Sequence, residues 1–382
     1  MESLEWLLAA TIDLTALNRT RFVPRIGKPV WLFAPAVSLL LAGVCLPGAS
    51  AASEKRQPST RSSGCSRFAS PTGSDRAPGT LRAPYRTFNR LAASLRPGMV
   101  GCLRAGTYGD RSTVEMIDRS GLPGRRIVIT GYQRERPTIF GAVFVSDHAD
   151  YVTLSDVAVE GANNLHPGGK PQSMEVWGRN FIFEDSTLTN RNSAVSGILV
   201  EADGAVIRRN KIHDVGGNFG YDHGIYVGQS HNFRIEQNWI YNCRVGWGVH
   251  LYPNAVDGRV RHNVIDGCGS GVTISGTSSQ TSRGNLVDHN LITKSVGLGR
   301  FNRGTAIAGC CASSPEGNLV AQNIFWGNVG GSFDGFVGKS YVARDNSSVN
   351  PRYVNAAAKD FRVKSSRAKR LGLWNGVVRS GR

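Results

Sequence analysis

A short repeated pattern in the middle of the chain narrows most strongly what it can fold into. Four runs, at residues 197–200, 224–227, 248–251 and 271–274, each begin with glycine and then alternate apolar residues with a residue free to face outward. Between them, a second pattern places an Asn two residues before an Ile. Extended along the chain, this second pattern gives the candidate equivalent positions Asp156, Asp185, Asn210, Asn238, Asn263, Asn290 and Asn323. Their spacing of 25 to 33 residues, in fixed order, predicts a solenoid.

The residues within each repeat select the kind of solenoid. The units contain short β-branched runs and Asn or Gly turns, and they lack a stretch with the apolar spacing of a helix. Equivalent residues of stacked coils would lie about 4.8 Å apart, the spacing between strands. Asn suits a tight corner because its amide can bond to the neighbouring coils and it tolerates the left-handed conformation. We therefore predict an all-β fold, a right-handed single-stranded parallel β-helix.

The pattern resembles the pectate-lyase-like β-helix superfamily over about residues 66–363. Residues 68–108 resemble the opening module of many secreted β-helix polysaccharide lyases, in which a short helix closes the open end of the solenoid. The resemblance places this N-terminal capping helix at about residues 87–95, where Phe88, Leu91 and Leu95 are spaced to face one side. Residues 350–372 resemble the closing segment of such proteins, and we assign residues 364–382 to a basic C-terminal tail.

The N-terminal region has the features of a targeting segment. Basic residues from Arg19 to Lys28 precede an apolar run at residues 30–44, and residues 49–51 form an A-x-A cleavage pattern. The run is shorter than the ~20 residues of a membrane-spanning helix, although an uncleaved anchor is the alternative. We expect a signal peptide at residues 1–51, a linker at residues 52–65, and a secreted or periplasmic monomer without stable membrane insertion.

The charge of the chain suggests the kind of partner. The formal net charge is +17, and a basic surface attracts polyanions. For an exported β-helix we expect that partner to be an acidic polysaccharide. We do not expect nucleic acid, because no recognised nucleic-acid-binding module is visible.

Cysteine positions indicate possible disulfides. Export would leave six cysteines in a compartment where disulfides can form. Cys243 and Cys268 each follow a repeat Asn by five residues, so they would lie in neighbouring coils and either pair or simply stack. Cys65 and Cys102 flank the N-terminal unit as a possible clasp. Six cysteines allow 15 pairing patterns, so the connectivity stays open.

The glycine-led runs also place a candidate site on one face of the solenoid. If the coils stack in register, the residues two and four after each glycine face outward, and consecutive coils then gather imidazole and phenol groups. The candidate catalytic residues are His223, His250, Tyr226 and Tyr252, and the candidate substrate-binding residues are Arg244, Trp247, Asp222 and Glu201.

This set of residue types suits elimination at a uronic acid. The reaction needs a base for the C5 proton and an acid for the leaving oxygen, and His and Tyr can fill these roles. His223 or His250 would be the base. Tyr226 or Tyr252 would be the acid, and Arg244 would hold the substrate carboxylate through two parallel hydrogen bonds. The predicted function is therefore that of a polysaccharide lyase acting by uronate β-elimination.

Other functions use the same residues differently. Tyr and His are common on outward strand positions, so a non-catalytic glycan-binding or cell-envelope protein is one alternative. Residues 221–224 resemble the Asp- and His-containing motif of β-helix mannuronate epimerases without its second acidic residue, which makes a C5-epimerase of polyuronate another. A hydrolase would need two carboxylates about 5–9.5 Å apart, and the strand columns do not offer such a pair.

Two further features of the repeat concern metals and the surface. Calcium is possible but no cofactor is certain, because a calcium site needs six to eight oxygens and the nearby acidic residues do not fall in one column. A column of alternating charge, which we interpret as a surface ion-pair ladder, consists of Arg208, Glu236, Arg261 and Asp288. Longer loops at residues 163–172, 277–284 and 298–315 are expected to shape a groove.

Overall fold

The computed structural model describes residues 64–133, 135–161, 172–193, 196–217, 222–298, 302–310 and 316–376. The expected signal peptide, nearly all of the linker, and much of the loops at 163–172 and 298–315 lie outside the described residues. Among the described residues, no helix is long and apolar enough to cross a membrane.

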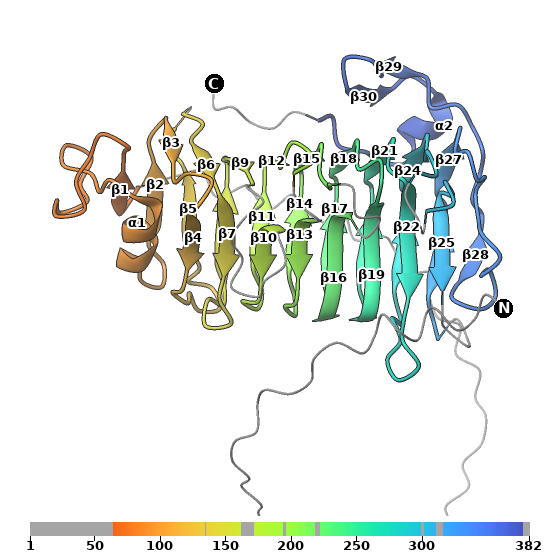
Figure 1. Cartoon of the computed structure of the whole chain (residues 1–382), viewed down its shortest axis with the longest axis horizontal. Helices are drawn as coiled ribbons and strands as arrows, with labels where there is room; N and C mark the ends of the chain where they lie inside the picture. Colours follow the sequence, from red (N-terminus) through yellow and green to blue (C-terminus); the bar gives the residue numbers. More distant parts are fainter. Residues whose placement is uncertain are drawn as a thin grey trace, which may run out of the picture. The chain divides into compact units, whose positions relative to one another are not determined.

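The described chain winds through three parallel sheets, and each coil passes from sheet A to sheet B to sheet C (Figure 1). Sheet A contains β1 (Arg67–Ala69), β2 (Val100–Leu103), β5 (Ile127–Gly131), β8 (Val152–Ser155), β11 (Ile182–Glu184), β14 (Val206–Arg208), β17 (Arg234–Glu236), β20 (Arg259–Arg261), β23 (Leu286–Asp288), β26 (Leu319–Ala321) and β28 (Val342–Arg344). Sheet B contains β3 (Thr107–Tyr108), β6 (Thr138–Phe140), β9 (Ala158–Glu160), β12 (Thr187–Thr189), β15 (Lys211–His213), β18 (Trp239–Tyr241), β21 (Val264–Asp266), β24 (Leu291–Thr293) and β27 (Ile324–Trp326). Sheet C contains β4 (Val114–Ile117), β7 (Ala142–Val145), β10 (Gln172–Val176), β13 (Ser196–Val200), β16 (His223–His231), β19 (Trp247–Val256), β22 (Ser270–Ser275) and β25 (Ile307–Cys310).

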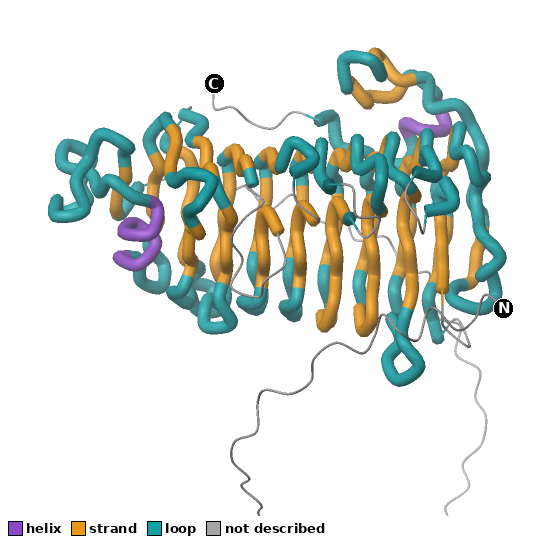
Figure 2. The backbone as a smooth tube through the Cα atoms, viewed as in Figure 1, coloured by secondary structure: helices purple, strands orange, loops and turns teal. Residues whose placement is uncertain are grey.

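The predicted fold is confirmed: the protein is a right-handed parallel β-helix. Figure 2 shows short strands of neighbouring coils lying side by side, with turns between the sheets. The core runs inside the coils, where Ile198, Ile225, Val249 and Val272 occupy one register position and are fully buried. The glycine-led runs lie in β13, β16, β19 and β22, so the repeat correctly gives the register of sheet C.

A ladder of Asn side chains, buried except at its half-buried last member, joins the corners between sheets A and B. In each pair the Nδ2 atom donates to the Oδ1 atom of the next Asn, at 3.0 to 3.2 Å. The members are Asn210, Asn238, Asn263, Asn290, Asn323 and Asn346. The predicted ladder is therefore correct from Asn210 onward.

The two N-terminal positions of the predicted ladder are wrong by one residue. Ser186, not Asp185, follows the ladder, because the Ser186 N–H donates to Oδ1 of Asn210 at 3.0 Å. Likewise the Val157 N–H donates to Oγ of Ser186 at 3.2 Å, which leaves Asp156 one position early. Asp156 and Asp185 instead have positive φ values of 52° and 51°. The left-handed corner residue is thus the one before the ladder position, and not the Asn itself.

The helix α1 (Phe88–Ser94) lies where the capping helix was predicted. Thr87 is its N-cap, and the Thr87 Oγ1 atom accepts a hydrogen bond from the Arg90 N–H at 3.1 Å. Phe88, Leu91 and Ala92 are buried, and α1 contacts β1, β2 and β4 at the start of the solenoid.

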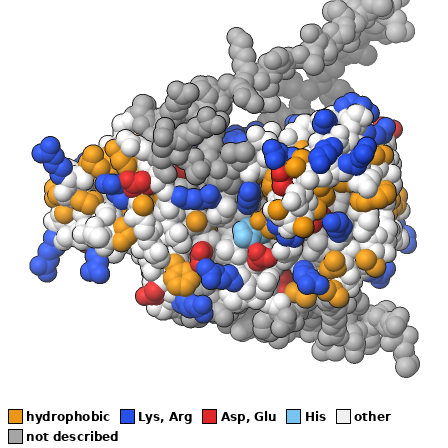
Figure 3. All heavy atoms as spheres, turned by 90° about the horizontal axis from the view of Figure 1, so that it is seen from above, with side chains coloured by type: hydrophobic (Ala, Val, Ile, Leu, Met, Phe, Trp, Pro, Cys, Tyr) orange, Lys and Arg blue, Asp and Glu red, His pale blue; other side chains and the backbone are white. Residues whose placement is uncertain are grey.

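The C-terminal segment folds back over sheet B. It contains the antiparallel hairpin of β29 (Tyr353–Asn355) and β30 (Asp360–Val363), followed by α2 (Ser366–Lys369). Phe361 and Leu371 are buried against Trp239 and Leu291 of sheet B. The described part of the expected basic tail therefore includes a packed helix. In Figure 3, Lys and Arg side chains are spread over the visible face of the molecule.

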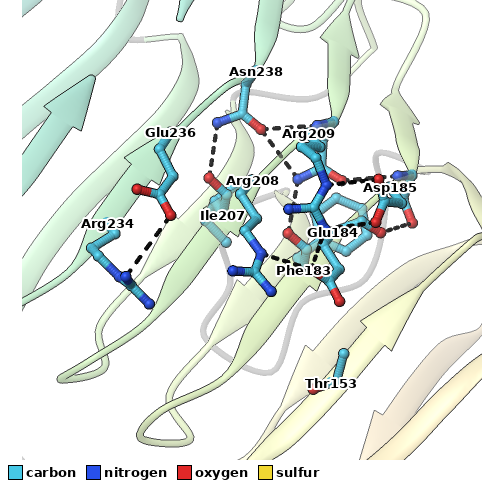
Figure 4. A network of polar contacts seen from close by, with 12 residues as sticks. Thr153, Phe183, Glu184, Asp185, Ile207, Arg208, Arg209, Arg234, Glu236 and Asn238 are labelled. Atoms are coloured by element: carbon cyan, nitrogen blue, oxygen red, sulfur yellow. Dashed lines mark hydrogen bonds and ion pairs between the residues drawn. The ribbon is translucent and has the colours of Figure 1, made fainter. Parts of the chain in front are cut away.

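The column of alternating charge on sheet A is aligned as predicted, but among the described residues only its last pair, Arg261 and Asp288, forms an ion pair within the column. Arg208, Glu236, Arg261 and Asp288 occupy one register position on consecutive strands. The Arg261 Nη2 atom lies 3.3 Å from Oδ2 of Asp288. Arg208 pairs with Glu184 of the preceding coil, with Nε 2.7 Å from Oε2, as Figure 4 shows. The carboxylates of Glu184 and Asp288 are buried, so these are not the exposed surface pairs that the sequence predicted.

Among the described residues, two disulfides close the chain on itself. Cys65 bonds to Cys102 near the N-terminal end, and Cys243 bonds to Cys268 in neighbouring coils. Both pairs that the sequence left open therefore form. Disulfides of this kind are typical of proteins outside the cytosol, which is consistent with an extracellular or periplasmic location.

Candidate functional site

The outward side chains of β16 and β19 form an aromatic group that we call the sheet C cluster. Its members are His223 and Tyr226 on β16, and Trp247, His250 and Tyr252 on β19. In the register of the two strands, His223 pairs with Trp247 and Tyr226 pairs with His250. The structure thus brings together the four residues predicted to be catalytic and one predicted to bind substrate.

The rings of the cluster pack directly on one another. The His223 ring is stacked on Tyr226 and on Trp247, with centroid separations of 4.8 and 5.1 Å. The His250 ring lies 5.0 Å from that of His223 and is stacked on Tyr252 at 5.5 Å. Ring pairs at such separations stabilise one another by about 0.5–1.5 kcal/mol. Mutual packing therefore fixes the orientation of both imidazoles.

The imidazoles have unpaired nitrogens. The Nε2 atom of His250 lies 2.7 Å from Oγ of Ser275 on β22. The Nδ1 atoms of His223 and His250 are buried and have no hydrogen-bond partner. Buried polar atoms are nearly always paired in folded proteins. These two nitrogens are therefore unsatisfied polar atoms covered by the rings of the cluster.

Burial sets the protonation state of the cluster. It lowers the pKa of His250 to about 3, and it holds the pKa of His223 well below its usual range, with the neighbouring His250 adding to the effect. Burial also raises the pKa of Tyr226, and the charge of Glu201 raises it further. At neutral pH both imidazoles are therefore uncharged and the Tyr226 hydroxyl keeps its proton.

Glu201 lies beside the cluster in a space that Gly228 provides. A Cβ atom at Gly228 would lie 2.0 Å from Oε1 of Glu201, so a larger residue would displace the carboxyl group. The Gln229 N–H donates to Oε2 of Glu201 at 2.7 Å. Burial raises the pKa of Glu201; the Gln229 N–H opposes this rise and the negative Glu175 adds to it. Glu201 is thus placed next to Tyr226, in the part of sheet C where it was predicted to bind substrate.

The sequence reasoning missed two residues near the cluster: Glu175 on β10, and Trp177 just after that strand. Glu175 is buried, with 4% of its surface exposed, and it shares a register column with Leu199. Trp177 is 42% exposed, and its Nε1 atom donates to Oε2 of Glu175 at 3.1 Å. Ser173 stands in this coil where the other runs have glycine. Met174 occupies the same register position as the buried apolar residues of the other coils. This match could have identified the coil although it has no leading glycine.

The remaining two predicted residues take different positions. Asp222 is fully buried, and burial raises its pKa to about 6 although a hydrogen bond from the Gly217 backbone opposes the rise. Its side chain lies against Gly216 and Gly246. This burial does not support the expected direct contact between Asp222 and a sugar. Arg244 is exposed, in the turn that leads into β19.

The described residues form cavities elsewhere and offer no evident metal centre. One cavity is lined by residues such as Phe140, Glu160 and Arg191, and another by residues such as Gln322 and Arg367. Neither is lined by a member of the sheet C cluster. Within the described ranges, no group of three or more His, Cys, Asp or Glu side chains is placed to hold a metal ion.

The fold defines a class, the right-handed parallel β-helix proteins. Residues 141–292 match the family model described as the right handed beta helix region, and this stretch contains the whole sheet C cluster. No curated protein matches the chain.

Solved structures with the same architecture include two whose likeness extends over most of both chains. Pectate lyase Pel9A is 14% identical, with 80% of this chain and 87% of that chain covered and a TM-score of 0.54. A glycoside hydrolase is 9% identical, with 80% of this chain and 98% of that chain covered and a TM-score of 0.58. At these identities the likeness is one of fold.

Proposed function

We propose that the protein acts on a uronate-containing polysaccharide bound over sheet C, by abstraction of the C5 proton and β-elimination. The observation that carries this proposal is the packing of two uncharged imidazoles, each with an unpaired buried nitrogen, against the protonated Tyr226. The likeness in fold to pectate lyase Pel9A supports an acidic polysaccharide as the substrate class.

The residues of the cluster divide the reaction between them. An unprotonated nitrogen of His223 or His250 takes the C5 proton. The electron pair left on C5 forms the C4–C5 double bond as the bond between C4 and the glycosidic oxygen breaks. The hydroxyl of Tyr226 or Tyr252 gives its proton to that oxygen. Trp247 keeps the His223 ring in place through their stacking contact.

The substrate carboxylate must be neutralised for C5 to become acidic. We assign this role to Arg244, which would hold the carboxylate through two parallel hydrogen bonds, or to a calcium ion bound together with the substrate.

The test is the appearance of a conjugated uronate, followed by ultraviolet absorbance, on a panel of pectate, alginate and glycosaminoglycans with and without calcium. We expect activity on one polymer and its loss in the double variant His223→Gln/His250→Gln. His213→Gln is the matched control, because His213 stacks on Tyr241 on sheet B at 4.9 Å, away from the cluster. An unchanged rate in the double variant would remove the assignment of the base.

A second function, glycan binding without catalysis, is favoured by one observation. A pKa of about 3 makes His250 a weak base in the free protein, and neither cavity lies at the cluster. In that case no polymer would give absorbance, but one would be retained on the immobilised protein. A C5-epimerase would also give no absorbance, and would change the uronate stereochemistry seen by NMR.

A further inference from the structure

The C-terminal segment places a strongly basic surface beside the last coils of the solenoid (Figure 1). Residues 350–376 contain seven Lys and Arg residues but only one acidic residue, Asp360. Asp360 forms an ion pair with Arg362. No ion pair with a described residue neutralises the other six basic side chains. A surface with this excess of positive charge attracts anionic ligands.

Two of these six side chains, Arg367 and Arg370, line a pocket that we call the α2 pocket. They are three residues apart, so they lie on one face of the helical turn. The opposite wall comes from the corners where sheet A turns into sheet B, and it includes His289, Gln322 and Asp345. The volume of about 250 Å³ is below the roughly 300–1,000 Å³ of sites for drug-sized ligands. The α2 pocket therefore suits a single sugar unit.

Packing of α2 holds the two arginines at the pocket. Ala368 and Leu371, which follow them in the sequence, are buried against sheet B. The Nε atom of Arg367 donates to Oγ of Ser347 at 3.1 Å, and this bond leaves its two terminal nitrogens without a described partner. The guanidinium of Arg370 is exposed and has no hydrogen bond or ion pair with a described residue. Both arginines are thus free to bind an anion, and a guanidinium can hold a carboxylate through two parallel hydrogen bonds.

A carboxylate on the opposite wall selects among anionic ligands. Asp345 is exposed and forms no ion pair with Arg367 or Arg370, although all three line the pocket. Its negative charge repels a bare phosphate or sulfate ion, but its oxygens can accept hydrogen bonds from hydroxyl groups. The exposed side chain of Gln322 adds an amide donor and acceptor. A uronic acid unit, which carries one carboxylate and several hydroxyl groups, matches this combination better than a bare oxyanion does.

The α2 pocket is separate from the sheet C cluster. None of its lining residues belongs to sheet C. The corner residues follow β23, β26 and β28, whose coils come two to four coils after that of β19. At about 4.8 Å per coil, this is roughly 10–19 Å along the solenoid axis. Only a polymer long enough to pass around the solenoid can reach both places, and a second contact by the same polymer raises the overall affinity.

We propose that the α2 pocket, with Arg367, Arg370 and Asp345, is an accessory binding site for a uronate unit of an acidic polysaccharide. It holds the polymer to the protein away from sheet C and takes no part in bond cleavage. That the bound polymer is also the substrate rests on the proposed function. The site itself does not, since it follows from the two unpaired arginines and the facing carboxylate.

The test is retention of the protein on immobilised pectate, alginate and a glycosaminoglycan, with neutral dextran as the reference. The buffer contains about 0.15 M salt, which screens weak long-range attraction. We expect retention on an acidic polymer and not on dextran, and Arg367→Gln/Arg370→Gln should weaken it about tenfold because both charge-assisted contacts are lost. Arg370→Gln alone should weaken it several-fold without disturbing α2. The control with the same change of charge is Arg96→Gln/Arg119→Gln, at two exposed arginines near α1 and β4, with an expected change below twofold.

Asp345→Ala separates a uronate from a bare oxyanion. It should weaken retention several-fold, and stronger retention would overturn the inference. No retention on any acidic polymer, equal losses in the two double arginine variants, or equally strong binding to DNA or to anionic phospholipid vesicles would also overturn it. The background His223→Gln/His250→Gln is used for any polymer that the wild type cleaves. The double variant at α2 should leave the elimination rate on short oligouronates unchanged. Absence of elimination on every polymer, together with the expected losses at α2, would overturn the proposed function alone.

Discussion

Substitution of Asn238 by alanine tests the view that the Asn ladder holds the coils in register. Asn238 is fully buried. Its Oδ1 atom accepts hydrogen bonds from the backbone N–H and the Nδ2 of Asn210, at 3.0 and 3.2 Å. Its Nδ2 atom donates to the Ile207 carbonyl at 2.8 Å and to Oδ1 of Asn263 at 3.0 Å. The substitution removes all four bonds at one site.

The magnitude follows from the partners left behind. Oδ1 of Asn263 still accepts from the Asn238 N–H, and Nδ2 of Asn210 still donates to the Phe183 carbonyl. The backbone N–H of Asn210 loses its side-chain acceptor in a buried corner. A buried unsatisfied group costs about 1–3 kcal/mol, and breaking a buried network is among the larger effects of single mutations. We expect a loss of about 3–5 kcal/mol in the free energy of unfolding.

Chemical denaturation followed by circular dichroism measures that loss, and hydrogen exchange locates it. Because each coil contacts only its neighbours, protection should fall in β14 to β21 and persist in distant coils. The control is Asn254→Ala, whose half-buried amide donates to Gln229, with an expected change within about 0.5 kcal/mol. A loss below about 1 kcal/mol for Asn238→Ala would show that water replaces the amide, and would refute the reasoning.

Three further outcomes follow from the structure. Because the pKa of Asp222 is raised to about 6, the folded protein keeps a proton between about pH 4 and 6 that the unfolded chain releases. The free energy of unfolding should therefore fall, by up to about 3 kcal/mol, as the pH rises from about 4 to 6. Asp222→Asn should abolish this fall in denaturation curves measured across that range. Gly228→Ala should displace the Glu201 carboxyl and lower the rate of uronate elimination several-fold in the absorbance assay. The double variant Cys243→Ser/Cys268→Ser, which opens a link across 25 residues, should lower the unfolding free energy by about 3 kcal/mol in denaturant.

The fold was predictable from sequence because the repeat encodes register directly. Equivalent apolar positions such as Ile225 and Val249 must coincide if each coil is to bury its side chains, so spacing alone aligns the strands. The ladder failed at Asp185 because the corner residue and the ladder residue are adjacent, and both are polar in that coil. Only the hydrogen bond from the Ser186 N–H to Asn210 distinguishes the two columns.

The candidate site was predictable only in part. The convergence of His223, Tyr226 and His250 follows from stacking, since residues at one register position become neighbours about 4.8 Å apart. Glu175 and Trp177 were missed because the search relied on glycine, and Ser173 replaces glycine in that coil. The strand pairs with its neighbours without a glycine at this position. Glycine there is therefore common among the coils but not required, and a search for it misses a coil that lacks it.

The repeat does not encode how deeply each side chain is buried, and this burial decides the chemistry of the site. Whether an outward residue is exposed or covered depends on the connections from sheet B to sheet C, whose lengths differ from coil to coil. Asp222 and His223 are adjacent in sequence, yet burial raises the pKa of Asp222 to about 6 and lowers that of His223. The strand columns therefore supply the residue types at the site, and the burial of each residue sets its protonation.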